Sequence, residues 1–201
     1  MTFLSILIGN KGSNIENTHI LSASYNLREF YMFQKNGVKE LCNFIARNGF
    51  YRNEVSKYTH ITHKGFYVSY YSNTSGLCIC AVFNDNNYPS QVIKRVLKLT
   101  LDEYISEYDD TWKNCDKDFS LPMKNLDNKL IKYNNPENAD TLYKINVDLQ
   151  ATKTIMHENI NKILERGEKI DELVQKSRDL SKSSKKFYKT TKKMNSCCNI
   201  S

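Results

Sequence analysis

The sequence predicts an α+β domain over residues 1–124, followed by a long helical coiled-coil segment. Two observations indicate this division. Before residue 124, stretches rich in β-branched and aromatic residues are separated by turn residues, and amphipathic helical stretches lie between or after them. After Pro136 the chain has no further proline and only one glycine, Gly167, which favours an uninterrupted helix.

Five strands are expected in the first part, at residues 2–8, 19–26, about 54–61, 65–71 and 77–84. Glycines between the first two strands, and a polar run ending in a glycine between the last two, are typical of turns and of a hairpin. The element order predicts a five-stranded antiparallel sheet covered by helices.

Helices are expected between and after these strands. Pro89 suits the first turn of a helix that ends near Glu107, and a shorter helix over 123–133 lies mainly in a linker, 125–135. An earlier helix is expected to end at a C-cap, Asn48-Gly49. Its apolar residues have helical spacing: Val38, Leu41, Cys42, Phe44 and Ile45.

Positive charge is concentrated near the C-terminus. The 201-residue chain has a net charge of +7 and a pI near 9.0, and no acidic residue follows Asp179. Such a chain suits an acidic partner, whether nucleic acid, an acidic protein face or an anionic membrane. The segment lacks the motifs of nucleic-acid binders, so we expect no nucleic-acid partner. The lysines over 182–193 form either a solvated helix face or a membrane contact.

No metal site is expected. Cys78 and Cys80 lie two apart in an apolar run, so on a strand they share one face. No second cysteine pair is available, which favours a pair of small core residues over half of a metal site. His60 and His63 have no acidic or cysteine companions at ligand spacing.

Several other classes of protein are also disfavoured. The apolar N-terminal stretch lacks the basic and small-residue flanks of a signal peptide. No stretch approaches the ~20 apolar residues of a membrane span. A cysteine-dependent enzyme would have to use Cys42 or Cys115, and neither has a candidate histidine partner in the sequence. We therefore expect a non-enzymatic protein.

A heptad seam runs through the predicted helix over residues 136–195. Asn135 is a good N-cap and Pro136 fits the first helical position. A continuous helix here would extend about 90 Å at ~1.5 Å per residue, and it would need partners to be stable. Steps of three and four define the seam positions: Leu142, Ile145, Leu149, Thr152, Met156, Asn159, Ile163, Arg166, Ile170, Leu173, Ser177, Leu180, Ser184, Phe187, Thr191 and Met194.

Arg166 is the only charged residue on this seam. Its guanidinium has five donors and no acceptor, and it stays charged. Parallel self-pairing would bring two such groups together, which is repulsive. Either the side chain leaves the seam along its aliphatic stem, or unlike helices supply oxygen acceptors at its level. Several small or polar seam residues fit a layer shared by several chains better than a two-stranded zipper.

The chain closely resembles the prenylated longin R-SNAREs, which are synaptobrevin relatives without a transmembrane segment. The resemblance covers essentially the whole chain, is most specific in the helix and tail, and includes the seam with its central arginine. The matching stretches are Tyr88–Ser90, Tyr133–Pro136, Leu164–Lys169, Leu173-Val174, Lys176-Ser177, Ser183–Lys185, Phe187–Lys189 and Lys192–Cys198.

The resemblance implies a profilin-like longin domain followed by an R-SNARE motif. Arg166 would form a central ionic layer with one glutamine from each of three Gln-SNARE helices, in a parallel four-helix bundle that draws two membranes together. Unpartnered, the motif would fold back on the longin domain, and Phe44 would hold the position of an intramolecular gate. Its spacing alone allows an ordinary core aromatic equally well.

The tail over 196–201 indicates lipid attachment. Cys198-Asn199-Ile200-Ser201 matches a prenylation box, and the final serine favours farnesyl, although Asn199 departs from the usual aliphatic residue. Cys197 is positioned for reversible palmitoylation, as the resemblance implies. We expect these two covalent lipids, no other cofactor, and exchange between the cytosol and the cytoplasmic faces of Golgi, endosomal or vacuolar membranes and vesicles. The alternative is a basic lipid-anchored regulatory or nucleic-acid-binding protein without fusion activity.

Overall fold

The computed structural model describes residues 3–63, 66–84, 89–134, 153–157, 169–177 and 180–197. In its first part the strands and α-helices follow one another in the predicted order. They are β1 (Phe3–Asn10), β2 (Ile20–Tyr25), α1 (Met32–Arg52), β3 (Lys57–His63), β4 (Phe66–Ser72), β5 (Leu77–Phe83), α2 (Ser90–Tyr108) and α3 (Leu126–Tyr133), with a short 3-10 helix at Thr111–Asn114.

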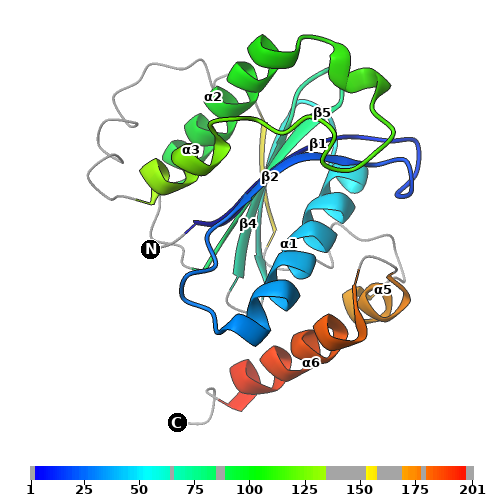
Figure 1. The fold of residues 1–201 in the computed structure, drawn as a ribbon, viewed down its shortest axis with the longest axis vertical. Helices are drawn as coiled ribbons and strands as arrows, with labels where there is room; N and C mark the ends of the chain where they lie inside the picture. Colours follow the sequence, from blue (N-terminus) through cyan, green and yellow to red (C-terminus); the bar gives the residue numbers. More distant parts are fainter. Residues whose placement is uncertain are drawn as a thin grey trace.

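The strands form one sheet, which Figure 1 shows between the helices. Their order in the sheet is β2-β1-β5-β4-β3-β6. The first five pair antiparallel, which confirms the predicted five-stranded antiparallel sheet with helices, consistent with a longin domain. A further strand, β6 (Lys153–His157), was not predicted. It comes from the C-terminal segment and pairs parallel with β3 at the edge of the sheet.

The central strand β5 is buried on both faces, because helices cover both sides of the sheet. Its side chains alternate between the two sides. Those under α2 and α3 are Leu77, Ile79, Ala81 and Phe83, and those under α1 are Cys78, Cys80 and Val82. The prediction that Cys78 and Cys80 form a core pair on one face is confirmed, and burial raises the pKa of Cys78 to about 12.

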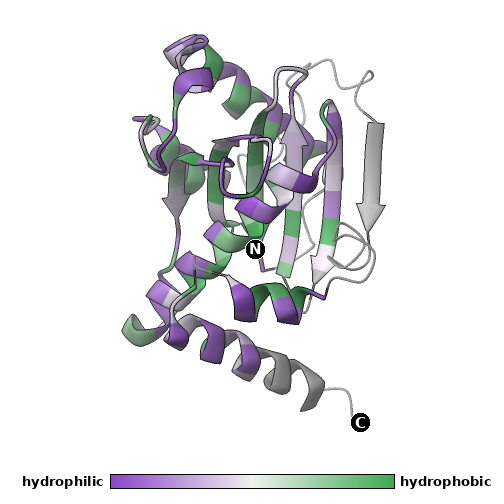
Figure 2. Ribbon diagram, turned by 90° about the vertical axis from the view of Figure 1, so that its right-hand side faces the viewer, coloured by the Kyte–Doolittle hydropathy of each residue, from purple (hydrophilic) through white to green (hydrophobic). Residues whose placement is uncertain are grey.

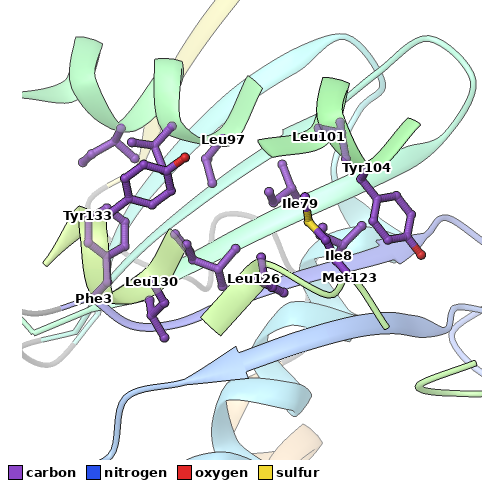
Figure 3. Close-up of a cluster of buried hydrophobic side chains, with 14 of the residues drawn as sticks. Phe3, Ile8, Ile79, Leu97, Leu101, Tyr104, Met123, Leu126, Leu130 and Tyr133 are labelled. Carbon is purple, nitrogen blue, oxygen red and sulfur yellow. The ribbon is translucent and has the colours of Figure 1, made fainter. Parts of the chain in front are cut away.

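Helices α2 and α3 pack together over one face of the sheet (Figure 3). Leu97 and Leu101 of α2 lie over Ile79, and Leu126 and Leu130 of α3 complete the layer. Tyr104 is fully buried, and its hydroxyl donates a hydrogen bond to the carbonyl oxygen of Leu121 at 3.0 Å. The short helix that was expected in a linker therefore packs into the core of the α+β domain.

The predicted end of α1 at Asn48-Gly49 is wrong, since the helix continues to Arg52 and Asn53 is its C-cap. Gly49 allows close packing against the helix and does not cap it. A Cβ added there would lie 2.0 Å from the ring of Tyr70 on β4. The Tyr70 hydroxyl donates to the carbonyl oxygen of Ile45 at 2.9 Å, so the ring lies directly against the helix backbone. Glycine permits this close approach.

The predicted continuous helix over 136–195 is not what the described residues form. The residues described after β6 form two helices, α5 (Ile170–Lys176) and α6 (Lys182–Cys197). Ser177, with φ −60° and ψ 133°, ends α5 in a non-helical conformation. The physical reason is burial. A lone helix of this length would leave its seam in water, whereas the broken arrangement places apolar side chains of α5 and α6 against the α+β domain.

Replacing Gly49 with alanine should destabilise the protein by about 1–3 kcal/mol, because the new methyl group would overlap the Tyr70 ring. Gly37→Ala is a matched control in the same helix, since its Cβ would meet Phe187 at an ordinary 3.5 Å. That change should raise the free energy of unfolding by up to about 1 kcal/mol. Urea unfolding followed by circular dichroism measures both. Equal effects of the two substitutions would contradict this account of Gly49.

Candidate partner-binding site

Helices α5 and α6 lie beside α1 (Figure 1), and their buried apolar side chains pack in one cluster with those of α1. Ile170 and Val174 of α5 are 4% and 0% exposed, and Tyr188 of α6 is 5% exposed. They belong to the same buried cluster as Val38 and Leu41 of α1. Helices α1 and α5–α6 therefore form one packed interface, which we call the docking interface.

The predicted seam divides into three groups in this arrangement. Ile170, Leu180 and Ser184 are buried at the docking interface, while Leu173, Ser177 and Phe187 are half-buried. Met156 lies in β6, at the position paired with His60 of β3, and Thr191 and Met194 lie in α6. The other predicted positions lie outside the described residues: Leu142, Ile145, Leu149, Thr152, Asn159, Ile163 and Arg166.

Val174 and Tyr188 are buried at the interface, although the seam prediction did not include them. Each follows a seam residue directly, so the buried stripe is wider than a strict heptad seam. That width is typical of a helix packed on a globular domain. Burial, and then the negative charge of the Asp171 carboxylate and a hydrogen bond to it, raise the pKa of the Tyr188 hydroxyl. This interaction connects α6 to α5.

Phe44 lies on α1 where the docking interface meets the core. It is 3% exposed and belongs to the cluster that contains Ile170 and Val174. It also lines an open pocket of about 620 Å³ together with Leu173 and Ser177. Phe44 is thus part of the domain core and also lies close to α5. Its role as a gate stays a prediction.

Glu40 of α1 caps the start of α6. One carboxylate oxygen accepts a hydrogen bond from the backbone N–H of Ser181 at 2.7 Å. The Ser181 hydroxyl accepts from the N–H of Ser184 at 3.2 Å, which makes Ser181 the N-cap. A carboxylate at this end of a helix also interacts favourably with the positive end of the helix dipole. Glu40 and Ser181 are far apart in sequence, so no local pattern indicated this contact.

The ionisation of Glu40 is coupled to docking. Burial raises the pKa of its carboxyl, but hydrogen bonds from Ser181 and Ser184 outweigh burial, and the net pKa lies below the usual 4.5. A lowered pKa means that the docked state prefers the carboxylate. The contribution of Glu40 to docking is therefore complete above the usual carboxyl pKa and is lost as the pH falls through the lower pKa of the docked state.

The other candidate residues show no catalytic or metal-binding arrangement in the described part of the chain. The described residues hold no group of three or more His, Cys, Asp or Glu side chains that could bind a metal ion. His60 is buried, and its Nδ1 lies 2.9 Å from the Ser69 hydroxyl oxygen. Burial raises the pKa of Cys42 to about 11, the opposite of an activated thiolate.

The structure describes one of the two predicted lipidation residues. Cys197 is the last residue of α6, and Cys198 lies outside the described residues. Among the helices that the structure describes, none is long and apolar enough to cross a membrane.

Both the C-terminal segment and the chain as a whole are similar to known proteins. Residues 141–200 match the family model described as Synaptobrevin. The chain is 39% identical to the VAMP-like protein YKT61 of Arabidopsis thaliana over 90% of each chain. It is 34% identical to the synaptobrevin homolog ykt6 of Schizosaccharomyces pombe over 90% of this chain and 91% of that one.

The longin-type sheet, followed by a segment that matches synaptobrevin, defines a synaptobrevin-like R-SNARE. More particularly, the chain belongs to the Ykt6 family of synaptobrevin homologues. The names of these relatives describe SNARE-type proteins rather than enzymes, which fits the expectation of a non-enzymatic protein.

Glu40→Gln should weaken docking of α6 by about 1 kcal/mol, because the uncharged amide is a poorer partner for the helix N-terminus. Hydrogen exchange of α6 amides should then accelerate about fivefold at pH 7, and the difference from wild type should shrink at acidic pH. Asp102→Asn is the control, since that carboxylate forms an exposed ion pair with Lys98 within α2. Unchanged exchange in the Glu40 variant would show that the cap does not hold α6.

Proposed function

We propose that this protein is a lipid-anchored R-SNARE that assembles with three Gln-SNARE helices to drive fusion of vesicles with their target membranes. The observation that carries the proposal is the seam around Arg166, which lies within the segment that matches synaptobrevin. In the proposed parallel bundle, three glutamine carbonyls satisfy the buried guanidinium and fix the register of the helices.

We further propose that the docking interface keeps the unassembled protein inactive. Apolar residues that a four-helix bundle would use, such as Ile170 and Leu180, are buried against the α+β domain. Met156 is held in a strand rather than a helix. Because one side chain cannot be buried in both places, assembly has to displace α5, α6 and β6 from the domain. Phe44 is the proposed gate of this step.

The proposed membrane anchor is the tail. Cys198 would carry a farnesyl group and Cys197 a palmitoyl group. One lipid chain holds a protein to a bilayer only marginally, so stable attachment needs a second signal. Removal of palmitate would return the protein to the cytosol from Golgi, endosomal or vacuolar membranes, and the lysines of α6 would add attraction to anionic lipid.

Arg166→Gln should weaken assembly with a set of three Gln-SNARE helices, because four glutamines cannot supply the missing charge-assisted hydrogen bonds. A compensating glutamine-to-arginine change in one partner should restore assembly. Lys169→Gln is the control, since Lys169 is exposed and lies off the seam. Circular dichroism and thermal melting of the complex measure assembly and thereby test the role of Arg166. Equal melting of wild-type and Arg166→Gln complexes would contradict it.

Cys197→Ser should shift most of the protein from membranes to cytosol in its native cell, because a single lipid chain such as farnesyl gives only marginal, reversible membrane binding. Cell fractionation measures the shift, and Ser196→Ala is the matched control. Intact mass spectrometry should show farnesyl on Cys198 in both variants. Full membrane residence of the Cys197→Ser variant would refute a palmitoyl anchor.

A further inference from the structure

Three consecutive large apolar residues project into solvent at the start of α1. Tyr31, Met32 and Phe33 are 71%, 86% and 82% exposed. We call them the apolar tip. The other exposed large hydrophobic residues in the described part of the chain are separated in sequence, for example Ile131 on α3 at 59%. Single exposed apolar residues are ordinary, whereas a contiguous group marks an interaction surface.

Local interactions hold the apolar tip in place. The Tyr31 backbone N–H donates to the Gln34 side-chain oxygen at 3.1 Å, and the Gln34 N–H donates to the Tyr31 carbonyl at 2.8 Å. The rings of Tyr31 and Phe33 stack, with centroids 5.8 Å apart and planes 4° from parallel. The tip is therefore a formed helix start, and presenting it to a partner requires little ordering.

The apolar tip lies at the same end of the molecule as the last turns of α6 (Figure 1). Two contacts define how the helices run past each other. Glu40 meets Ser181, and Gly37, one turn nearer the tip, adjoins Phe187. Moving toward the tip along α1 thus means moving toward Cys197 along α6.

Exposed lysines lie on both helices beside the contact of Gly37 with Phe187. Lys186 and Lys189 of α6 are exposed, as is Lys39 of α1, and the described part of α6 is largely hydrophilic (Figure 2). No acidic residue follows Asp179 in the sequence. The nearest acidic residue in sequence to the tip is Glu29, whose carboxylate accepts a hydrogen bond from the Asn84 amide.

We propose that the apolar tip inserts into an anionic lipid bilayer while the exposed lysines of α6 contact its headgroups. A bilayer offers anionic groups at its surface and hydrocarbon a few ångströms below, which matches lysines beside exposed apolar side chains. Tyrosine rings also favour the membrane interface. This contact belongs to the docked conformation and adds a weak attraction to the attachment that the covalent lipids provide.

The direct test uses the full chain without lipid modification and sedimentation with vesicles. Phosphatidylcholine vesicles with and without phosphatidylserine provide the two arms. The wild type should partition onto the phosphatidylserine vesicles, and Met32→Ser combined with Phe33→Ser should lower the partition constant about tenfold or more, because two large side chains lose their burial. Ile131→Ser, an exposed apolar residue on α3, is the matched control and should leave partitioning unchanged.

A second measurement tests insertion itself. Phe33→Trp should give tryptophan emission that shifts to the blue with phosphatidylserine vesicles and is quenched by brominated acyl chains, while the buried Trp112 supplies the background. Equal partitioning of wild type and the double variant, or no quenching at position 33, would overturn the proposal. So would loss of self-association by the double variant without loss of vesicle binding, since the occupant would then be a second copy of the chain. Because the fusion partners are absent, the result does not depend on the proposed SNARE assembly.

Discussion

The docked arrangement depends on one constraint, which is that the apolar side of the C-terminal segment must be shielded from water. In the isolated chain α1 provides the surface, and Val174 and Tyr188 are buried there. The hydrophobic effect sets no direction and no register. Glu40 sets the direction and the register of α6, because its carboxylate accepts a hydrogen bond from one backbone N–H at the start of that helix. Burial thus provides the affinity, and the cap fixes the position of the helix.

The edge of the sheet adds a second element to this arrangement. Strand β6 pairs with β3 from Lys153 to His157, and it contains Met156, which is also a position of the heptad seam. The same stretch can therefore satisfy its backbone hydrogen bonds in a sheet or, with partner helices, in a helix. These two states exclude each other. Under the proposed function, bundle formation removes β6, α5 and α6 from the domain. Docking and assembly therefore compete directly.

Most of the α+β domain was predictable from sequence because its strands and helices carry their own periodicity. The continuous apolar run of β5 and the stripe of α2 are examples. The end of α1 was mispredicted because Gly49 accommodates Tyr70, a residue from a distant strand. Strand β6 was missed because its conformation depends on the free edge of β3 rather than on its own pattern. The contact between Glu40 and Ser181 joins residues 141 positions apart, which no local pattern reveals. By contrast, a wider helical stripe would have found Val174 and Tyr188.

In the isolated chain, β6, α5 and α6 are docked on the domain rather than exposed as a free seam. Hydrogen exchange of the full, unpartnered chain, resolved to peptides covering β6 and α6, can detect this docking. We expect amides over 153–157 to be protected together with their partner strand β3, and amides of α6 to exchange far more slowly than those of an unstructured peptide. Exchange of both segments at the rate of unstructured peptide, with β1 and β5 still protected, would contradict it.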